Sequence, residues 1–199
     1  MFFLLGLLLA YLLGSIPFAI IVSRCAGLQD PRTFGSGNPG ATNVLRTGNK
    51  VAAFITLIGD ALKGAIAIWF GILLQPLLGF EPAQIACFGV AAFVGHVYSV
   101  FLKFKGGKGV ATALGVLIAM NWILGLASAA TWIIIAFFFR YSSLASLITA
   151  VFAVLYAGLL FGINAQLLAI VSMSALLIFK HKTNIIKLIH GQETQIGKK

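Results

Sequence analysis

The chain has 199 residues, of which 60% are hydrophobic and only 9% are charged. Soluble domains are roughly 45–50% apolar and about 25% charged, so the composition excludes an ordinary soluble domain and indicates an integral membrane protein. The net charge of +10 would suggest nucleic acid as the partner of a soluble protein, but topology explains it better here, and we expect no nucleic-acid partner.

The first apolar stretch, residues 2–22, is interpreted as a retained membrane span. No basic region precedes it, no small-x-small cleavage site follows it, and Arg24 comes directly after it. A cleaved signal peptide would have both a preceding basic region and such a cleavage site. A basic residue directly after an apolar stretch is instead the expected flank of a span that stays in the membrane.

Length and polar breaks set the number of further spans. A transmembrane helix needs about 20 apolar residues, with a range of about 17–25. The stretches 51–74 and 82–102 each fit one crossing, whereas 110–139 and 144–179 exceed the range. Polar breaks at Asn121-Trp122 and at Gly162-Ile163-Asn164 divide them. We predict an all-α integral membrane protein of one domain, 1–199, with about seven transmembrane helices near 2–23, 51–75, 82–102, 109–120, 122–139, 144–161 and 164–179.

The distribution of basic residues orients this arrangement. Seven crossings place the termini on opposite sides of the membrane. With the N-terminus outside and the C-terminus in the cytoplasm, every basic residue except Lys63 falls on the inner side, Lys198 and Lys199 included, as the positive-inside rule requires. Five or six crossings would place Arg140 or the basic tail outside. The loops 24–50, 103–108 and 180–199 then all face the cytoplasm.

The first loop has the composition of an anion-binding loop. Its glycines, Gly35, Gly37 and Gly40, allow positive φ and a close approach of the backbone to a ligand. Successive exposed N–H groups in such a loop form a concavity for anions, and Arg46 can add a bidentate contact to phosphate. The alternative interpretation is a flexible loop. The candidate contacts in this loop are Ser36, Gly37, Asn38, Gly40, Thr42, Asn43 and Arg46.

The second loop, Lys105-Gly106-Gly107-Lys108-Gly109, leads directly into the apolar stretch that begins at Val110. A glycine loop before a helix presents free N–H groups and the positive end of the helix dipole to an anion. It is not a Walker A loop, because the spacer between glycines and the Ser/Thr after the lysine are missing. The alternative is a basic anchor for anionic lipid, worth about 1 kcal/mol per cation. Three glycines have no use in such an anchor.

The third polar segment follows the last predicted span and contains His181, Asn184 and Lys187. At helical spacing Asn184 lies on the same side as His181, which predicts a short interfacial helix with both side chains facing the site. Ser142 and Ser143, on the inner side between two spans, can add hydroxyl contacts. Taken alone, a histidine at a membrane surface is more often without function.

Some ionisable residues lie inside predicted spans. Asp60 and Lys63 are three residues apart on one helical face and are interpreted either as a mutual ion pair or as functional groups, because buried charges are costly in a membrane. His96, and the cysteines Cys25 and Cys87, are interpreted as packing residues. No metal-ligand cluster and no nucleophile elbow is visible, so we expect neither a metal nor a cofactor.

These residues form three ordered motifs, and the chain resembles the acyl-phosphate-dependent glycerol-3-phosphate acyltransferases of bacteria. The similarity runs from Leu13 to Glu193 and rests on Gly35-Ser-Gly-Asn-x-Gly-x-Thr-Asn43 with Arg46, on Lys105-Gly-Gly-Lys-Gly-Val-Ala-Thr112, and on His181-x-x-Asn184-Ile185-x-x-Leu188-x-x-Gly191-x-Glu193. One departure is Lys187, where the family usually has Arg.

The resemblance implies transfer of a fatty acyl group from acyl phosphate to the 1-hydroxyl of glycerol 3-phosphate, giving lysophosphatidate and phosphate. It also implies the bacterial cytoplasmic (inner) membrane, contact with membrane lipid, and an upstream enzyme that forms acyl phosphate. We expect His181, Asn184 and Ser36 to be catalytic. The expected substrate contacts are Ser36, Gly37, Asn38, Gly40, Thr42, Asn43, Arg46, Lys105, Gly106, Gly107, Lys108, Ser143, His181 and Asn184.

Two alternatives remain at the level of sequence. A transporter for a small organophosphate would share basic loops, but it should place polar residues near the bilayer midplane, where Asp60 and Lys63 are the only candidates. A purely structural or lipid-binding protein would have no need of the glycine loops. The general base also stays open between His181, with an ordinary pKa of about 6.5, and the acceptor's phosphate, with a second pKa of about 6.

Overall fold

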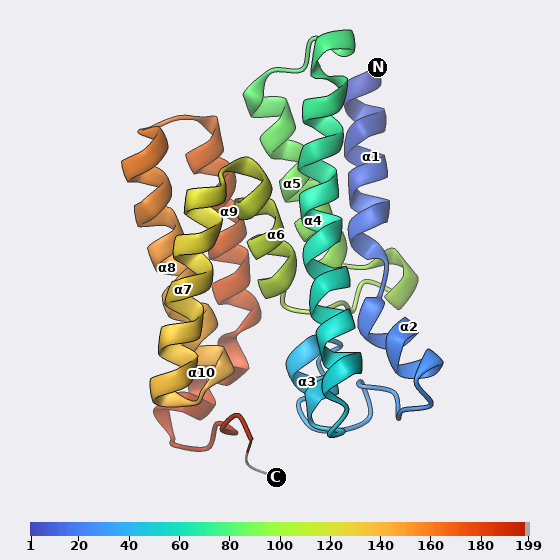
Figure 1. Ribbon diagram of the computed structural model, residues 1–199, viewed down its shortest axis with the longest axis vertical. Coiled ribbons are helices and arrows are strands. Elements are labelled where there is room, and N and C mark those ends of the chain that lie inside the picture. The colour runs from blue at the N-terminus through green and yellow to red at the C-terminus, as the bar shows by residue number, and fades with distance from the viewer. Residues whose placement is uncertain (198–199) are drawn as a thin grey trace.

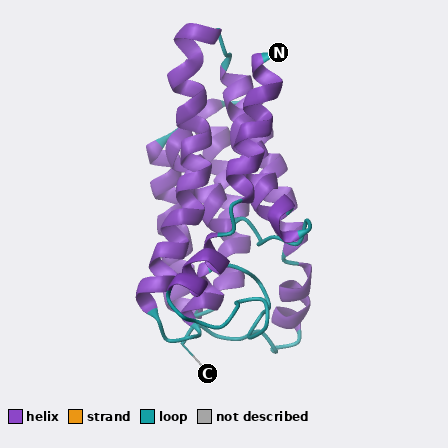
Figure 2. Cartoon of the chain, turned by 90° about the vertical axis from the view of Figure 1, so that its right-hand side faces the viewer, coloured by secondary structure: helices purple, strands orange, loops and turns teal. Residues whose placement is uncertain are grey.

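The computed structural model describes residues 1–197, and all regular elements in that range are helical (Figures 1 and 2). They are α1 (Phe2–Ser15), α2 (Phe18–Cys25), α3 (Ala41–Leu45), α4 (Lys50–Leu78), α5 (Pro82–Val97), the 3-10 turn η1 (Val100–Leu102), α6 (Val110–Met120), α7 (Trp122–Phe139), α8 (Ser142–Phe161), α9 (Ala165–Lys180) and α10 (Lys182–Ile189).

The bundle has the dimensions of a membrane domain. Within the described range, five segments are long and apolar enough to cross a membrane: 2–25, 50–78, 82–102, 122–139 and 142–161. A sixth is counted if α9 and α10 are taken together across their 57° bend, and α6 is a shorter apolar helix. Large apolar side chains such as Leu77 and Leu159 are exposed on the outside of the bundle. The prediction of an all-helical membrane protein is confirmed, with five to six candidate spans.

The two predicted polar breaks are helix boundaries. Asn121 lies between α6 and α7, and its Oδ1 accepts hydrogen bonds from the N–H groups of Ile123 and Leu124. Asn164 caps α9 in the same way by accepting from the N–H of Leu167. An asparagine at the N-cap satisfies N–H groups that the helix cannot pair internally, and for that reason both breaks are well defined.

One break was not predicted. The sequence predicts a continuous helix over 2–23, but the structure divides it into α1 and α2 at Ile16-Pro17. Proline has no N–H for the helical ladder, and it pushes the preceding residue toward extended backbone. Ile16 adopts that conformation, with φ −59° and ψ 120°, and its carbonyl oxygen is thereby released from the helix.

Small residues bring the helices into close contact. A Cβ added at Gly64 of α4 would overlap the carbonyl of Thr112, and one at Gly115 of α6 would overlap that of Ala61. The same holds between α1 and α5, where Gly14 packs on the backbone of Ala92. Helices in membranes associate through such small residues because lipid gives no hydrophobic drive to pair them. The tight α4–α6 contact fixes the start of α6, and with it the second loop.

The polar loops gather at one end of the bundle. Met1 lies at the opposite end from the described C-terminal tail, and α2, α3 and α10 lie at the tail end (Figure 1). The view turned by 90° shows the long loops crowded at that same end (Figure 2). Lys198 and Lys199 lie outside the described residues. The interpretation of Cys25 and Cys87 as packing residues is wrong, because both are exposed free thiols on the outer surfaces of their helices.

Candidate functional site

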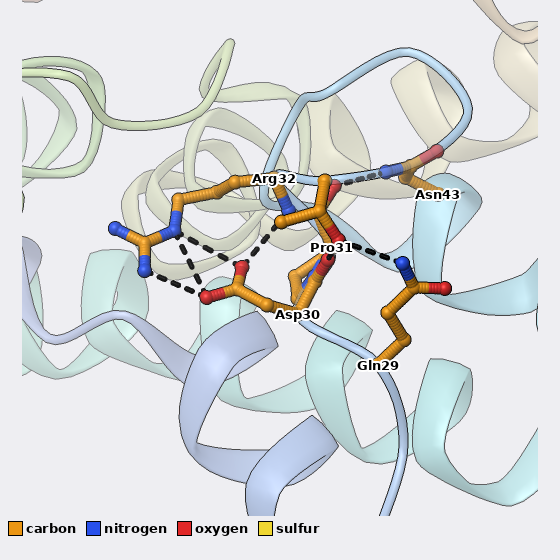
Figure 3. A network of polar contacts seen from close by, with 6 residues as sticks. Gln29, Asp30, Pro31, Arg32 and Asn43 are labelled. Atoms are coloured by element: carbon orange, nitrogen blue, oxygen red, sulfur yellow. Dashed lines mark hydrogen bonds and ion pairs between the residues drawn. The ribbon is translucent and has the colours of Figure 1, made fainter.

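The first loop is organised around the buried side chain of Asn43. Its Nδ2 donates to the carbonyl oxygen of Pro31 at 2.6 Å (Figure 3) and to that of Phe34 at 3.2 Å. Its Oδ1 accepts a hydrogen bond from the backbone N–H of Ser36. These contacts use both amide hydrogens of Asn43, so its side chain holds the loop in shape.

An ion pair fixes the part of the first loop that follows α2. Asp30 accepts three side-chain hydrogen bonds from the guanidinium of Arg32 and one from its backbone N–H (Figure 3). The hydrogen bond to Arg32 is the main cause that lowers the pKa of Asp30 to about 2. Arg32 is therefore paired within the loop, whereas the Arg46 side chain has no hydrogen bond or ion pair within residues 1–197 and remains available to a ligand.

Arg46 lies directly against Gly35. A Cβ at Gly35 would contact both the Arg46 guanidinium and the Asn43 side chain, and Gly35 has a φ of 57°. Such a left-handed conformation strains any residue with a Cβ, so both backbone and space require glycine here. Ser36, Gly37, Thr42 and Arg46 are exposed around this turn, and Asn38 and Gly40 are half-buried.

The second loop folds back onto the end of α5. The N–H of Gly106 donates to the carbonyl of Val97, and the N–H of Gly107 donates to that of His96. Gly109, with φ 88°, is the N-cap of α6, so the prediction that this loop opens a helix is confirmed. Between them Lys108 extends to the third segment, where its Nζ donates to Oδ1 of Asn184.

The third segment forms the predicted short helix, α10, with Asn184 buried on it and His181 buried at the α9–α10 bend. The Nδ2 of Asn184 donates to Oε1 of Glu193 at 2.8 Å. The same carboxylate oxygen accepts from the hydroxyl of Ser143 at 2.8 Å. A continuous chain of contacts thus runs from Lys108 through Asn184 and Glu193 to Ser143.

Positive charge dominates the surroundings of Lys108. Burial is the main cause that lowers the pKa of its ammonium, and the neighbouring cations Lys187, Arg46 and Lys180 lower it further. Glu193 is the one carboxylate that acts in the opposite direction. A bound dianion would relieve this repulsion, so the charge distribution favours a phosphate ligand.

His181 is set up as a neutral imidazole. Burial lowers its pKa to about 4 despite the hydrogen bond to the carbonyl of Leu177, which acts in the opposite direction. Nδ1 lies 2.8 Å from that carbonyl oxygen, so Nδ1 carries the hydrogen and Nε2 carries the lone pair. In this tautomer Nε2 accepts a hydrogen bond, as from a hydroxyl, and cannot donate one to a phosphate.

The contacts of the structure join some of the predicted residues and leave others apart. The hydroxyls of Thr42 and Ser142 lie 3.2 Å apart, which joins the first loop to the start of α8. Gly106 and Gly107 hold the turn that carries Lys108 by hydrogen bonds of their N–H groups to the end of α5. Lys105 is exposed, and none of the hydrogen bonds within residues 1–197 links its side chain to the other predicted contacts.

Two residues of this region were not predicted as site residues. Glu193 was noted only as part of the third motif, and Ser142 only as a possible hydroxyl contact. The scarcity of carboxylates could have identified Glu193, because the chain has only four acidic residues and this one lies among cations. Over residues 1–197 no group of three or more His, Cys, Asp or Glu could hold a metal ion.

Comparison with known proteins gives one consistent result. Residues 4–191 match the profile of the family described as glycerol-3-phosphate acyltransferase. A glycerol-3-phosphate acyltransferase of Ralstonia nicotianae is 60% identical over 190 residues, which cover 96% of this chain and 92% of that protein. The corresponding protein of Paraburkholderia phymatum is 58% identical, with 96% and 90% covered.

The fold is similar to solved structures as well. The crystal structure of PlsY (YgiH), an integral membrane glycerol 3-phosphate acyltransferase, in its glycerol 3-phosphate form superposes with a TM-score of 0.91 at 37% identity. The match covers 99% of this chain and 96% of that one. Its lysophosphatidic acid form gives a TM-score of 0.89 at 36% identity, with the same coverage.

Proposed function

Because the chain belongs to the glycerol-3-phosphate acyltransferase family, we propose that it transfers a fatty acyl group from acyl phosphate to the 1-hydroxyl of glycerol 3-phosphate. The products are 1-acylglycerol 3-phosphate, which is lysophosphatidate, and inorganic phosphate. Related solved structures are described in glycerol 3-phosphate and lysophosphatidic acid forms, which supports this acceptor and this product.

The observation that carries the proposal is the convergence of three motifs on one cationic, hydrogen-bonded site. Lys108 from the second loop contacts Asn184 from the third segment, and Glu193 links Asn184 to Ser143. The hydroxyl of Thr42 from the first loop lies 3.2 Å from that of Ser142, the neighbour of Ser143 in the chain. Both proposed substrates carry phosphate, and a site with this excess of cations suits two phosphates held side by side.

In the proposed reaction, Arg46, Lys105 and Asn184 hold the phosphate of glycerol 3-phosphate. Ser36, Asn38 and the glycine loop with Lys108 hold the acyl phosphate. Because Lys108 and Asn184 are in contact, the two phosphate positions adjoin, which places the acceptor beside the donor. Such placement is a large part of the rate acceleration in a two-substrate reaction.

The chemical step needs no covalent enzyme intermediate. The acceptor oxygen attacks the acyl carbon, the bond from that carbon to the phosphate oxygen breaks, and phosphate leaves with the electron pair. N–H groups of the first loop stabilise the oxyanion, a contribution of about 3 kcal/mol per donor in known cases. The proton of the attacking hydroxyl goes to a base.

We assign the base to the phosphate of the acceptor and a positioning contact to His181. An imidazole with a pKa of about 4 is a weaker base than a phosphate monoester, whose second pKa is about 6, and a base works best with a pKa near the operating pH. With Nδ1 bonded to the carbonyl of Leu177, Nε2 of His181 accepts a hydrogen bond from the other hydroxyl of glycerol 3-phosphate and orients the acceptor, so the proton of the attacking 1-hydroxyl is left for the phosphate.

We further propose seven crossings, with the N-terminus outside and the site facing the cytoplasm of a bacterial inner membrane. This adds α6 and α9 as short spans to the five long ones. It is supported by the gathering of the three motifs with the basic residues at one end of the bundle, following the positive-inside rule. An acyl-phosphate-forming enzyme would supply the donor on the same side.

The proposal is tested with purified protein in detergent, labelled glycerol 3-phosphate, and palmitoyl phosphate, palmitoyl-CoA or palmitoyl-carrier protein as the single donor. Labelled lysophosphatidate from palmitoyl phosphate alone is the expected result. Product from the CoA or carrier-protein thioester would keep the acceptor and overturn the donor. No product from any donor, in protein with a cooperative unfolding transition, would overturn the proposed reaction and favour the alternative function, organophosphate transport.

A further inference from the structure

Three ionisable residues are buried together beneath the two substrate loops. Asp60 and Lys63 lie on α4 and His96 lies near the end of α5, and their exposed fractions are 3%, 2% and 8%. None of them belongs to the reaction described above. Charges at such depth in a membrane protein are expensive and generally serve a function.

Lys63 is held by two oxygen atoms. Its Nζ lies 2.9 Å from Oδ1 of Asp60 and donates a hydrogen bond of 2.9 Å to the carbonyl of Ile16. That carbonyl is available because Pro17 breaks the helix there. The cluster is therefore anchored to the α1–α2 break as well as to α4, and the predicted Asp60–Lys63 ion pair is confirmed.

His96 extends this cluster to the glycine loop. Its Nδ1 lies 3.5 Å from Oδ1 of Asp60, so the earlier interpretation of His96 as a simple packing residue is incomplete. The opposite edge of the imidazole lies against Gly107, where a Cβ would overlap Nε2. The backbone of His96 also accepts the hydrogen bond from the N–H of Gly107.

A small cavity beside the cluster excludes a phosphate-binding site at this position. It is lined by Asp60, Lys63 and His96 together with Pro39 of the first loop and Gly107 of the second. Its volume is about 10 Å³, close to the minimum for a single water molecule. A phosphate group does not fit, so the cluster supports the two loops from behind.

Stability alone does not account for the arrangement. A buried ion pair is weak evidence for stability, because an apolar pair of similar volume is often as stable or more so. An ion pair between Asp60 and Lys63 also needs no histidine. A role in supporting the turn that carries Lys108 accounts for the arrangement. The contacts run continuously from the α1–α2 break through Lys63, Asp60 and His96 to Gly107 in that turn.

We propose that Asp60, Lys63 and His96 are positioning residues for acyl transfer: Asp60 and Lys63 orient the His96 imidazole, whose edge sets the position of the 106–109 turn and so of Lys108. The inference rests on the proposed function for the role of Lys108. Displacement of a loop by about 1 Å costs on the order of 100-fold in rate in well-ordered sites, which gives such a support a measurable effect.

The test is a double-variant cycle on His96 and Gly107. Gly107→Ala forces a Cβ into the imidazole, and His96→Ala removes that obstacle. We expect each single variant to lower kcat/KM about tenfold or more, and the double variant to be no worse than His96→Ala alone, because contacting residues are non-additive. Gly106→Ala is the matched control: its Cβ would overlap the backbone carbonyl of His96, so His96→Ala should not relieve it.

Additive losses for His96 and Gly107 would overturn the proposal, as would equal relief of Gly106→Ala. A second variant, Asp60→Leu/Lys63→Met, replaces the charges by an apolar pair. We expect an unfolding temperature close to that of the unchanged protein and a kcat/KM lower by about tenfold. Full activity of that variant would reduce the cluster to an ion pair without a positioning role.

A second readout separates this inference from the proposed donor. The rise in unfolding temperature on adding glycerol 3-phosphate reports binding through mass action, and it needs no acyl donor. We expect this rise in unfolding temperature to be small in Gly107→Ala and to be no smaller in the double variant than in His96→Ala alone. If palmitoyl phosphate proves not to be the donor, relief in the binding shift still supports the positioning role, and its absence still contradicts it.

Discussion

At the scale of single residues, one carboxylate oxygen organises two side chains of the site. Oε1 of Glu193 accepts from both Ser143 and Asn184. We predict that Glu193→Ala lowers kcat about tenfold or more, because hydrogen bonds to a charged group contribute roughly 1.5–3 kcal/mol each. Glu193→Gln keeps an acceptor at this position and should lose less. Lysophosphatidate formation by both variants measures this, and equal losses would assign the effect to charge and not to hydrogen bonding.

His181 gives a pH prediction with a definite sign. Its pKa is lowered to about 4, so the imidazole stays neutral through the range from pH 5 to 8 and produces no change of rate there. The acceptor phosphate, with a second pKa of about 6, loses its base form as the pH falls. We predict an acid limb with a midpoint near pH 6 in kcat, retained in His181→Ala at a lower overall rate. A limb that disappears in this variant would make His181 the base.

At the scale of elements, the asparagine caps explain how long apolar stretches divide. Asn121 accepts from two N–H groups at the start of α7, and Asn164 from one at the start of α9. We predict that Asn121→Ala costs about 1 kcal/mol, which lowers the unfolding temperature of a chain of this size by about 2–4 °C. Asn164→Ala should cost somewhat less.

Asn121 and Asn164 follow the C-terminal ends of α6 and α8, whose N-terminal ends lie at the motif loops, so the activity of these variants at a temperature well below unfolding should equal that of the unchanged protein. Thermal unfolding in detergent and the acyltransferase assay measure the two effects. A large loss of activity without a loss of stability would mean that the cap residues reach the site, contrary to the structure.

At the scale of the whole molecule, the proposed topology can be read by chemical labelling. In a background of Cys25→Ser and Cys87→Ser, Ile163→Cys tests the turn between α8 and α9, where Ile163 is 95% exposed, and Gln192→Cys tests the tail. We predict that a membrane-impermeant maleimide labels position 163 in intact cells and position 192 only after permeabilisation. The reverse pattern would invert the proposed orientation, and labelling of both in intact cells would remove one crossing.

The sequence predicted the elements better than their connections. Composition and polar breaks were enough for the helical membrane class and for the boundaries at Asn121 and Asn164, because those causes are local. The break at Pro17 lies within an apolar run of normal span length, so length hid it. Contacts between distant segments, such as Ser143 with Glu193 or His96 with Asp60, depend on how helices pack, and no spacing along the chain encodes them.

The shortness of α6 has a consequence for the surrounding lipid. Its 11 residues cover about 16 Å, roughly half of the hydrocarbon thickness of a typical bilayer. Such hydrophobic mismatch is relieved when the bilayer thins locally or when neighbouring helices shield the polar ends. In the proposed seven-span topology, local thinning of the bilayer at α6 would bring the headgroups and acyl chains closer to the glycine loop at the start of this helix. A bilayer of shorter-tailed lipids would match α6 better, so we expect bilayer thickness to change the activity of the site.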